Sequence, residues 1–375
     1  MSSEAIASRS AAPSSAPKCS VLLPAGLQSG LSRSHLPSLD GLRALAAFAV
    51  VFYHYGISWC PAGLGVLAFF VLSGFLITWL LLKEEERHGQ ISLRSFYIRR
   101  SLRVFPAFYV YWFLIAGLAL WLHRPILTPQ AIASFFYLSN YYQAIFGDPN
   151  TGLSHTWSLG VEEQFYLLWP LAFLLLRDNK KRVQFLALMI AAVWIYREVL
   201  VFVVHRDQGY IYEAFDTRVD HPLLGCLLAV ILRSGRMPGL WRRLCSTPLW
   251  AWLTLALLVL SATVQNLSGT TYRDAVGFIV DPLLVAILLA QTIASRDAGL
   301  GKLLNLPWLR YLGTISYSVY LYQQIVIGPI KKITHPWPWL SPIAAVLGVI
   351  LFASGSYWLI EKPFLKLKDR FSRVR

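Results

Sequence analysis

The sequence predicts an all-α integral membrane protein, a polytopic bundle of about ten transmembrane helices. Of its 375 residues, 56% are hydrophobic and only 14% are charged, and the mean hydropathy is +0.52. Soluble domains carry about 25% charged residues, so too few charges remain here for a water-exposed surface. Several apolar runs also reach the roughly 20 residues that a helix needs to cross a bilayer. A soluble two-domain protein, which the length alone would suggest, is therefore excluded.

Ten apolar segments are expected to cross the bilayer, in alternating directions. The sixth is short for a full crossing. The stretch 128–146 is expected to be a re-entrant or interfacial helix, because a full crossing there would turn the basic run 177–182 outward. The ten segments are residues 42–57, 63–82, 104–122, 155–176, 183–204, 219–232, 248–265, 275–294, 311–330 and 339–360.

The distribution of basic residues predicts the orientation. With the N-terminus placed in the cytoplasm, 26 of the 34 lysines and arginines fall in inner segments and 6 in outer ones. Cytoplasmic loops of membrane proteins collect Lys and Arg in this way. The net charge of +15 therefore reflects topology, and no nucleic-acid partner is expected.

Three regions are expected along the chain. Residues 1–35, rich in Ser, Ala and Pro, are expected to form a disordered cytoplasmic tail rather than a signal peptide. Residues 36–364 hold the membrane domain, and 365–375 form a basic cytoplasmic tail. The four cysteines are scattered, and no set of His, Cys and carboxylates has the spacing of metal ligands, so no metal is expected.

The first span contains Arg43 and His54, and an ionisable residue inside a span is costly enough to suggest a functional site. The two residues are eleven positions apart, about 20° from three full turns, so they share one helix face roughly 16 Å apart. Asp40 is a plausible N-cap of this helix. In the structural alternative, Arg43 extends to the inner headgroups and His54 makes a packing hydrogen bond.

Two adjacent carboxylates, Glu162 and Glu163, lie near the start of the fourth span, which opens at His155. Their expected depth, roughly 10–12 Å below the outer boundary, is similar to that of His54. One of them is therefore predicted to orient the His54 imidazole as a general base. A structural His–Glu contact is the alternative, and the spacing does not decide which glutamate faces His54.

Arg100 and Arg103 lie one helical turn apart in the first inner loop. They are either ordinary cytoplasmic charge or a clamp for phosphate groups, which the arginine fork suits. The pair Ser73–Gly74 lies within a span without the strand–turn–helix context of a nucleophile elbow, so close helix packing is the better interpretation.

His155 and a charged cluster at another outer span mouth are candidates for binding the acceptor. The cluster contains Asp216, Arg218 and Asp220. Its charges either pair among themselves or line an acceptor site.

Four segments together resemble the membrane-bound acyltransferase-3 family: LDGLRALAAFAVVFYH, FFVLSGFLIT, FYIRRSLRVFPAFYV and HTWSLGVEEQFYLLWP. The later segments DTRVDHPLLGCLLA and IEKPF are similar to it too, so the resemblance runs from about residue 36 to 364. The resemblance implies a bundle of about ten helices that moves an acyl group from cytoplasmic acyl-CoA to a hydroxyl of a carbohydrate or glycosylated acceptor.

The resemblance also implies roles for the polar residues named above. The family's paired arginine and histidine match Arg43 and His54, its loop arginines match Arg100 and Arg103, and its acidic motif matches the two glutamates of the fourth span. One departure is visible near the ninth span. The family often reads Tyr-Leu-Trp-His there, whereas this chain has Tyr-Leu-Tyr and then Gln323.

The predicted function is membrane O-acyl transfer, with acetyl as the expected group. Acyl-CoA is the expected donor substrate, and no bound cofactor is expected. Its phosphates are predicted to lie near the loop arginines and its pantetheine arm to pass Arg43 toward His54. Direct transfer and an acyl-histidine intermediate both stay open. The alternative is a transporter or flippase of a glycolipid or polyol-like substrate. The resemblance implies a bacterial inner membrane as the location.

Overall fold

The computed structural model describes residues 23–33, 35–123, 128–335, 337 and 339–371, and within these ranges it contains helices and no strands. The all-α class is therefore confirmed. Residues 1–22 and 372–375 of the two expected tails lie outside the described residues. Residues 25–31, which the sequence places in a disordered tail, form a helix whose Leu27 and Leu31 are buried. Gly26 and Gly30 let this helix pack against the backbone of Ala294 and Ile293.

The helices follow one another with short connections. Their bounds are α1 Ala25–Leu31, α2 Pro37–Tyr55, α3 Ala62–His88, α4 Leu93–Trp121, α5 Thr128–Phe135, α6 Ser139–Phe146, η2 Ser154–Thr156, α7 Trp157–Leu175, α8 Asn179–Phe202, α9 Gln208–Glu213, α10 Phe215–Arg218, α11 Asp220–Arg233, α12 Pro238–Leu244, α13 Leu249–Ser268, α14 Thr270–Tyr272, η3 Arg273–Gly277, α15 Phe278–Ala294, α16 Gly299–Leu304, α17 Pro307–Thr314, α18 Ser316–Ile333, α19 Ser341–Ser356, η4 Tyr357–Glu361, α20 Lys362–Lys368 and η5 Asp369–Phe371.

Six helical stretches of the described chain are long and apolar enough to cross a membrane, or seven if α11 and α12, bent by 107°, form one broken span. The predicted count of about ten is therefore not confirmed. Polar residues and helix breaks account for the difference, since α2 and α7 carry the ionisable residues of the candidate site and α17 ends before α18 begins. The six stretches are Ala62–His88, Leu93–Trp121, Asn179–Phe202, Leu249–Ser268, Thr270–Ala294 and Ser341–Lys368.

Two local expectations need correction. The stretch 128–146 forms two short helices, α5 and α6, because the chain turns at Tyr137, whose φ is 57°. Asp40 is not an N-cap, because α2 begins earlier, at Pro37, and Leu36 is its cap residue. Asp40 instead lies in the first turn, where it accepts a hydrogen bond from His35 at 3.0 Å.

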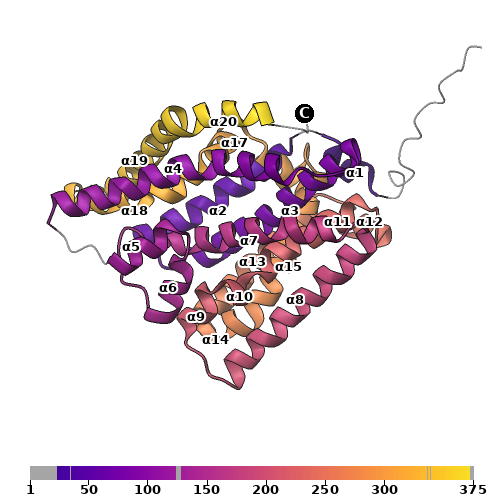
Figure 1. Cartoon of the computed structure of the whole chain (residues 1–375), viewed down its shortest axis with the longest axis horizontal. Coiled ribbons are helices and arrows are strands. Elements are labelled where there is room, and N and C mark those ends of the chain that lie inside the picture. The colour runs from indigo at the N-terminus through magenta and orange to yellow at the C-terminus, as the bar shows by residue number, and fades with distance from the viewer. Residues whose placement is uncertain (1–22, 34, 124–127, 336, 338, 372–375) are drawn as a thin grey trace, which may run out of the picture.

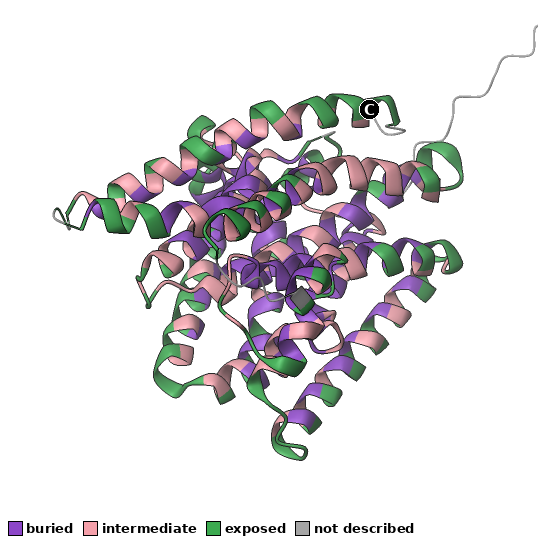
Figure 2. Cartoon of the chain, turned by 60° about the vertical axis from the view of Figure 1, so that its left-hand side comes forward, coloured by how far each residue is buried: buried purple, intermediate pink, exposed green. Residues whose placement is uncertain are grey.

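Helices α2 and α3 lie in the middle of the bundle, with α4 and α17–α20 on one side and α8, α13 and α15 on the other (Figure 1). Buried residues gather around this centre, whereas exposed ones follow the outer helices (Figure 2). Many of the exposed side chains are apolar, such as Leu188, Leu260 and Leu351. An apolar outer surface is what lipid contact requires, so the exposed faces of these helices suit a membrane protein.

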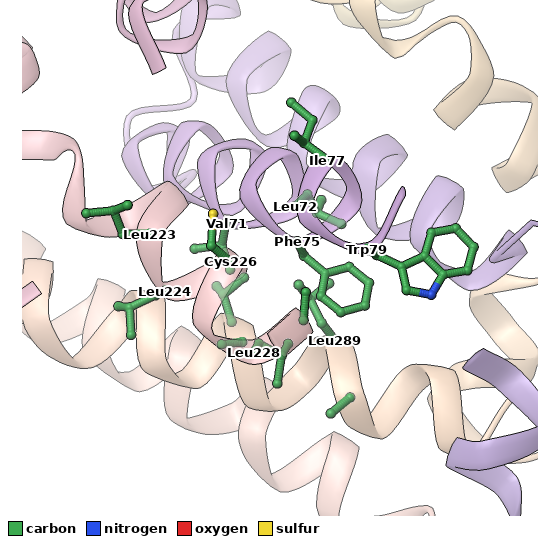
Figure 3. Close-up of a cluster of buried hydrophobic side chains, with 14 of the residues drawn as sticks. Val71, Leu72, Phe75, Ile77, Trp79, Leu223, Leu224, Cys226, Leu228 and Leu289 are labelled. Carbon is green, nitrogen blue, oxygen red and sulfur yellow. The ribbon is translucent and has the colours of Figure 1, made fainter. Parts of the chain in front are cut away.

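Glycines allow α3 and α11 to cross with their backbones nearly touching. A Cβ at Gly74 would lie 1.8 Å from the Pro222 carbonyl oxygen, and one at Gly225 would lie 2.0 Å from that of Val71. The crossing brings together a cluster of apolar side chains that includes Phe75 and others labelled in Figure 3. Close packing, predicted for the Ser73–Gly74 pair, is therefore confirmed for Gly74.

The substitution Gly225→Ala is expected to destabilise the protein, because the new methyl group would collide with the backbone of α3. Overpacking of this kind costs about 1–3 kcal/mol. The loss is measured as the fraction of detergent-solubilised protein that stays monodisperse after heating. The matched control is Gly117→Ala, since nothing lies within 4 Å of a Cβ there. Equal heat resistance of both variants would contradict this packing.

Candidate active site

A cavity of about 740 Å³ lies inside the bundle, between α2, α3, α4, α7, α17 and α18. One end is lined by His35 and Asp40 at the start of α2, and we call it the rim. The other end reaches Ser158 of α7 and Tyr320 of α18, and we call it the inner end. Its walls combine apolar side chains with charged and hydroxyl-bearing ones, so polar groups converge on a partly apolar space, as in small-molecule sites.

Cations outnumber carboxylates among the charged residues that line the cavity. Arg43, Arg100 and Arg103, which the sequence singled out separately, all line it. The Arg100 guanidinium lies 3.4 Å from the centre of the Tyr166 ring. Within the described residues, Nε of Arg43 and of Arg100 is buried without a hydrogen-bond partner. The site therefore holds concentrated positive charge and spare donors, which suits an anionic ligand.

The two adjacent glutamates have different surroundings. Glu162 lines the cavity and its Oε1 accepts a hydrogen bond of 2.8 Å from the Ser73 hydroxyl. That hydroxyl in turn accepts one of 2.9 Å from Tyr166. Glu163 does not line the cavity but lies near Arg100. Ser73, interpreted from the sequence as a packing residue, is therefore also part of the site.

His54 does not meet either glutamate, which corrects the predicted contact. It lies in the last turn of α2, half-buried, with Gln323 beside it and His155 nearby. In the part of the chain that the structure describes, it forms no hydrogen bond with Glu162 or Glu163. The cause is where the helices begin and end. His54 is next to the last residue of α2, whereas Glu162 lies more than one turn into α7 and reaches the level of Arg43 instead.

His155 connects the inner end of the cavity with His54. It lies in the turn before α7 and is buried, and its Nε2 lies 3.1 Å from the Leu321 carbonyl oxygen. The Tyr320 hydroxyl donates to the His155 carbonyl at 2.8 Å and lies 2.5 Å from the Ser158 hydroxyl. Tyr320 and Ser158, which line the cavity, are thus in direct contact with the backbone of His155. Both were missed by the sequence reasoning.

A third carboxylate, Glu361, was also missed. It is buried at the end of the π-helical turn η4, where it accepts a hydrogen bond of 2.5 Å from Ser318. Arg43 and Arg103 lie close enough to act on its charge. π-Helical turns are frequent at functional sites. The IEKPF segment quoted for the family resemblance is the signal that could have found this residue.

The outer charged cluster lies away from the cavity, and its charges have partners elsewhere. Asp220 and Arg197 of α8 form a fully buried ion pair of 3.1 Å. Asp216 accepts hydrogen bonds of 2.9 and 3.0 Å from Tyr141 and Tyr210. Asp220 and Asp216 are therefore neutralised or hydrogen-bonded by residues outside the cluster, rather than by Arg218 as one alternative had it.

Arg218 is the exception in this cluster. Its side chain is fully buried, and its guanidinium carbon lies 3.9 Å from the centre of the Phe278 ring and 5.0 Å from that of Tyr212. None of its side-chain nitrogens has a hydrogen-bond partner among the described residues. Aromatic faces thus surround this charge. Over the same residues, no group of three or more His, Cys, Asp and Glu side chains could hold a metal ion.

Comparison with known proteins shows which family this chain resembles. Residues 36–361 match a family model described as an acyltransferase domain. The chain is 35% identical over 359 residues to the peptidoglycan O-acetyltransferase OatA of Listeria monocytogenes, covering 89% of this chain and 56% of that protein. It is 35% identical over 353 residues to YrhL of Bacillus subtilis, whose name assigns the same activity provisionally, covering 88% and 55%.

A provisionally named O-acetyltransferase of Staphylococcus aureus is 31% identical over 351 residues, with 88% of this chain and 58% of that protein covered. The chain thus spans little more than half the length of these relatives. No solved structure matches. The transporter or flippase alternative is not favoured by these matches. Because the family model covers most of the chain, and the relatives named above are 31–35% identical to it, the chain belongs to the acyltransferase-3 family.

Proposed function

We propose that this protein transfers an acetyl group from acetyl-CoA, entering from the cytoplasm, to a hydroxyl of a carbohydrate acceptor. The observation that carries the proposal is the cation-lined cavity, which runs from the rim at the start of α2 to the hydroxyls of Tyr320 and Ser158. The excess of basic residues on the expected inner loops supports a cytoplasmic rim in a bacterial inner membrane. The names of the relatives support O-acetylation of a carbohydrate.

The donor is held by charge at one end and by hydrogen bonds along its arm. Arg100 and Arg103 bind the diphosphate, because the planar guanidinium pairs with phosphate oxygens. Arg43 of α2 and Glu162 of α7 line the same cavity and lie close enough to act on each other's charge. Glu162, held by Ser73, offers carboxylate oxygens to the amide N–H groups of the pantetheine arm. The thioester then reaches the inner end of the cavity.

The acceptor approaches from the side of His54. The half-buried imidazole at the end of α2 takes the proton from the acceptor hydroxyl as its oxygen attacks the thioester carbonyl. The C–S bond then breaks, and the coenzyme A thiolate leaves through the cation-lined cavity and is protonated. Gln323, rather than a glutamate, lies beside the imidazole and orients it. The same geometry leaves an acyl-histidine intermediate open.

The direct test is transfer of radiolabelled acetyl from acetyl-CoA by the purified protein in detergent, with a panel of hydroxylated carbohydrates as acceptors. Labelled acceptor is the expected product. Failure with every acceptor, while the protein stays monodisperse, would argue against the proposed function.

The substitution His54→Ala is expected to lower turnover by about 10²–10⁴-fold, because general-base assistance contributes that much to rate. The initial rate of labelled acetyl transfer measures the effect. The control is His335→Ala, since His335 is exposed and lies outside the cavity. Near-wild-type turnover of His54→Ala would reject His54 as the base.

The substitution Ser73→Ala is expected to lower kcat/KM for acetyl-CoA by about tenfold or more. Hydrogen bonds to charged groups contribute about 1.5–3 kcal/mol, and Glu162 would lose one. Ser268→Ala, at the exposed end of α13, should leave kcat/KM unchanged. If both variants behaved alike, Glu162 would have no part in donor binding.

A further inference from the structure

A second group of cations lies at the rim of the cavity, apart from the arginines that the sequence singled out. Arg310 of α17 and Lys368 of α20 both line the cavity, and Arg310 lies close enough to His35 to act on its charge. Nε of Arg310 is buried and has no hydrogen-bond partner within the described residues. The cavity therefore has two cationic stations, an inner one with Arg100 and Arg103 and a rim one with Arg310 and Lys368.

Glycines fix the rim station in place. A Cβ on Gly313 would lie 1.9 Å from the Asp40 carbonyl oxygen, and one on Gly41 would lie 2.2 Å from that of Leu304. The first turn of α2 is therefore in backbone contact with α17 and with the end of α16. Arg310 lies about one turn before Gly313, so this contact holds it at the mouth of the cavity.

The nearest carboxylate at the rim is already engaged. Asp40 accepts a hydrogen bond of 3.0 Å from His35, and this bond raises the pKa of that imidazole. Arg310 lies close enough to act in the opposite direction, which places its charge beside the pair. In the described chain, no ion pair joins Arg310 to a carboxylate. The Arg310 guanidinium is therefore available to a ligand at the rim.

The chemistry of the donor explains two separate stations. Coenzyme A carries a diphosphate in the middle and a further phosphate on the ribose 3′-oxygen, at the end farthest from the thioester. With the thioester at Tyr320 and the diphosphate at Arg100 and Arg103, the ribose lies toward the rim. An acyl group on a carrier protein is held by phosphopantetheine, which has one phosphate and would leave the rim station without a ligand.

We propose that Arg310 and Lys368 form a subsite for the ribose 3′-phosphate, so that this protein selects a free coenzyme A thioester over a carrier-bound acyl group. The inference rests on the proposed function, because it takes an acyl-CoA as the donor. It adds a recognition site outside the residues assigned to that function.

The test compares acetyl-CoA with acetyl-3′-dephospho-CoA as donors for the wild type and for Arg310→Gln. The wild type is expected to have a KM about tenfold lower for acetyl-CoA, as one charged hydrogen bond would give. Arg310→Gln should raise KM for acetyl-CoA about tenfold, leave KM for the dephospho donor within twofold, and leave kcat unchanged. Lys302→Gln removes an exposed cation of neighbouring α16 and should preserve the discrimination.

Two outcomes would overturn the subsite. One is that the wild type has the same KM for the two donors. The other is that Arg310→Gln raises KM equally for both donors. If that variant does not fold, the subsite is tested by inhibiting the wild type with adenosine nucleotides. Adenosine 3′,5′-bisphosphate should inhibit at least tenfold better than adenosine 5′-monophosphate, and equal inhibition would reject the subsite. Failure of the proposed function is distinguishable, because the wild type would then transfer acetyl from neither donor.

Discussion

The structure depends on keeping arginines inside an apolar bundle. A charged side chain at the centre of a bilayer costs about 2.5–3.5 kcal/mol or more, so each one needs a partner or a ligand. Arg197 meets this need with Asp220, and Arg182 with Glu85 at 2.7 Å. Arg43, Arg100 and Arg103 instead line a cavity, and Nε of Arg43 and of Arg100 has no hydrogen-bond partner among the described residues. Whether an arginine has a carboxylate partner thus distinguishes arginines with a structural role from arginines with a functional one. Paired arginines hold helices together, whereas unpaired arginines beside a cavity indicate an anionic ligand.

The sequence predicted the all-α class and several charged residues of the cavity, but not which polar groups meet. Arg43 and Glu162 could be found because intramembrane charge is costly in any fold. Arg100 and Arg103 could be found because they lie one helical turn apart in an inner loop. The partner of His54 could not be found. Its predicted depth was counted from a span that begins near residue 42, whereas α2 begins at Pro37, and the fourth span was taken to start at His155. The left-handed Gly56 ends α2 at once, and a short turn precedes α7, so the glutamates move away from the imidazole.

The polar residues that reveal the site also make the number of spans harder to predict. The residues that mark the site make their helices less apolar, so α2 and α7 lack the uniform hydropathy of α3 or α15. Such helices are shielded from lipid by their neighbours, and α2 and α3 lie in the middle of the bundle (Figure 1). Tertiary position, which composition does not reveal, decides whether a polar helix is tolerated.

Glycine positions connect the packing to the chemistry. Gly74 follows Ser73, so the face of α3 that touches α11 is next to the side chain that holds Glu162. Gly313 is pressed against Asp40 and thereby sets the position of Arg310 at the rim. In both places a backbone contact without a Cβ lies within one helical turn of a cavity residue. Rigid supports of this kind hold polar groups in position more firmly than loops would. The cavity therefore keeps its two cationic stations at a set separation, which a ligand with two phosphate groups requires and a singly phosphorylated one does not.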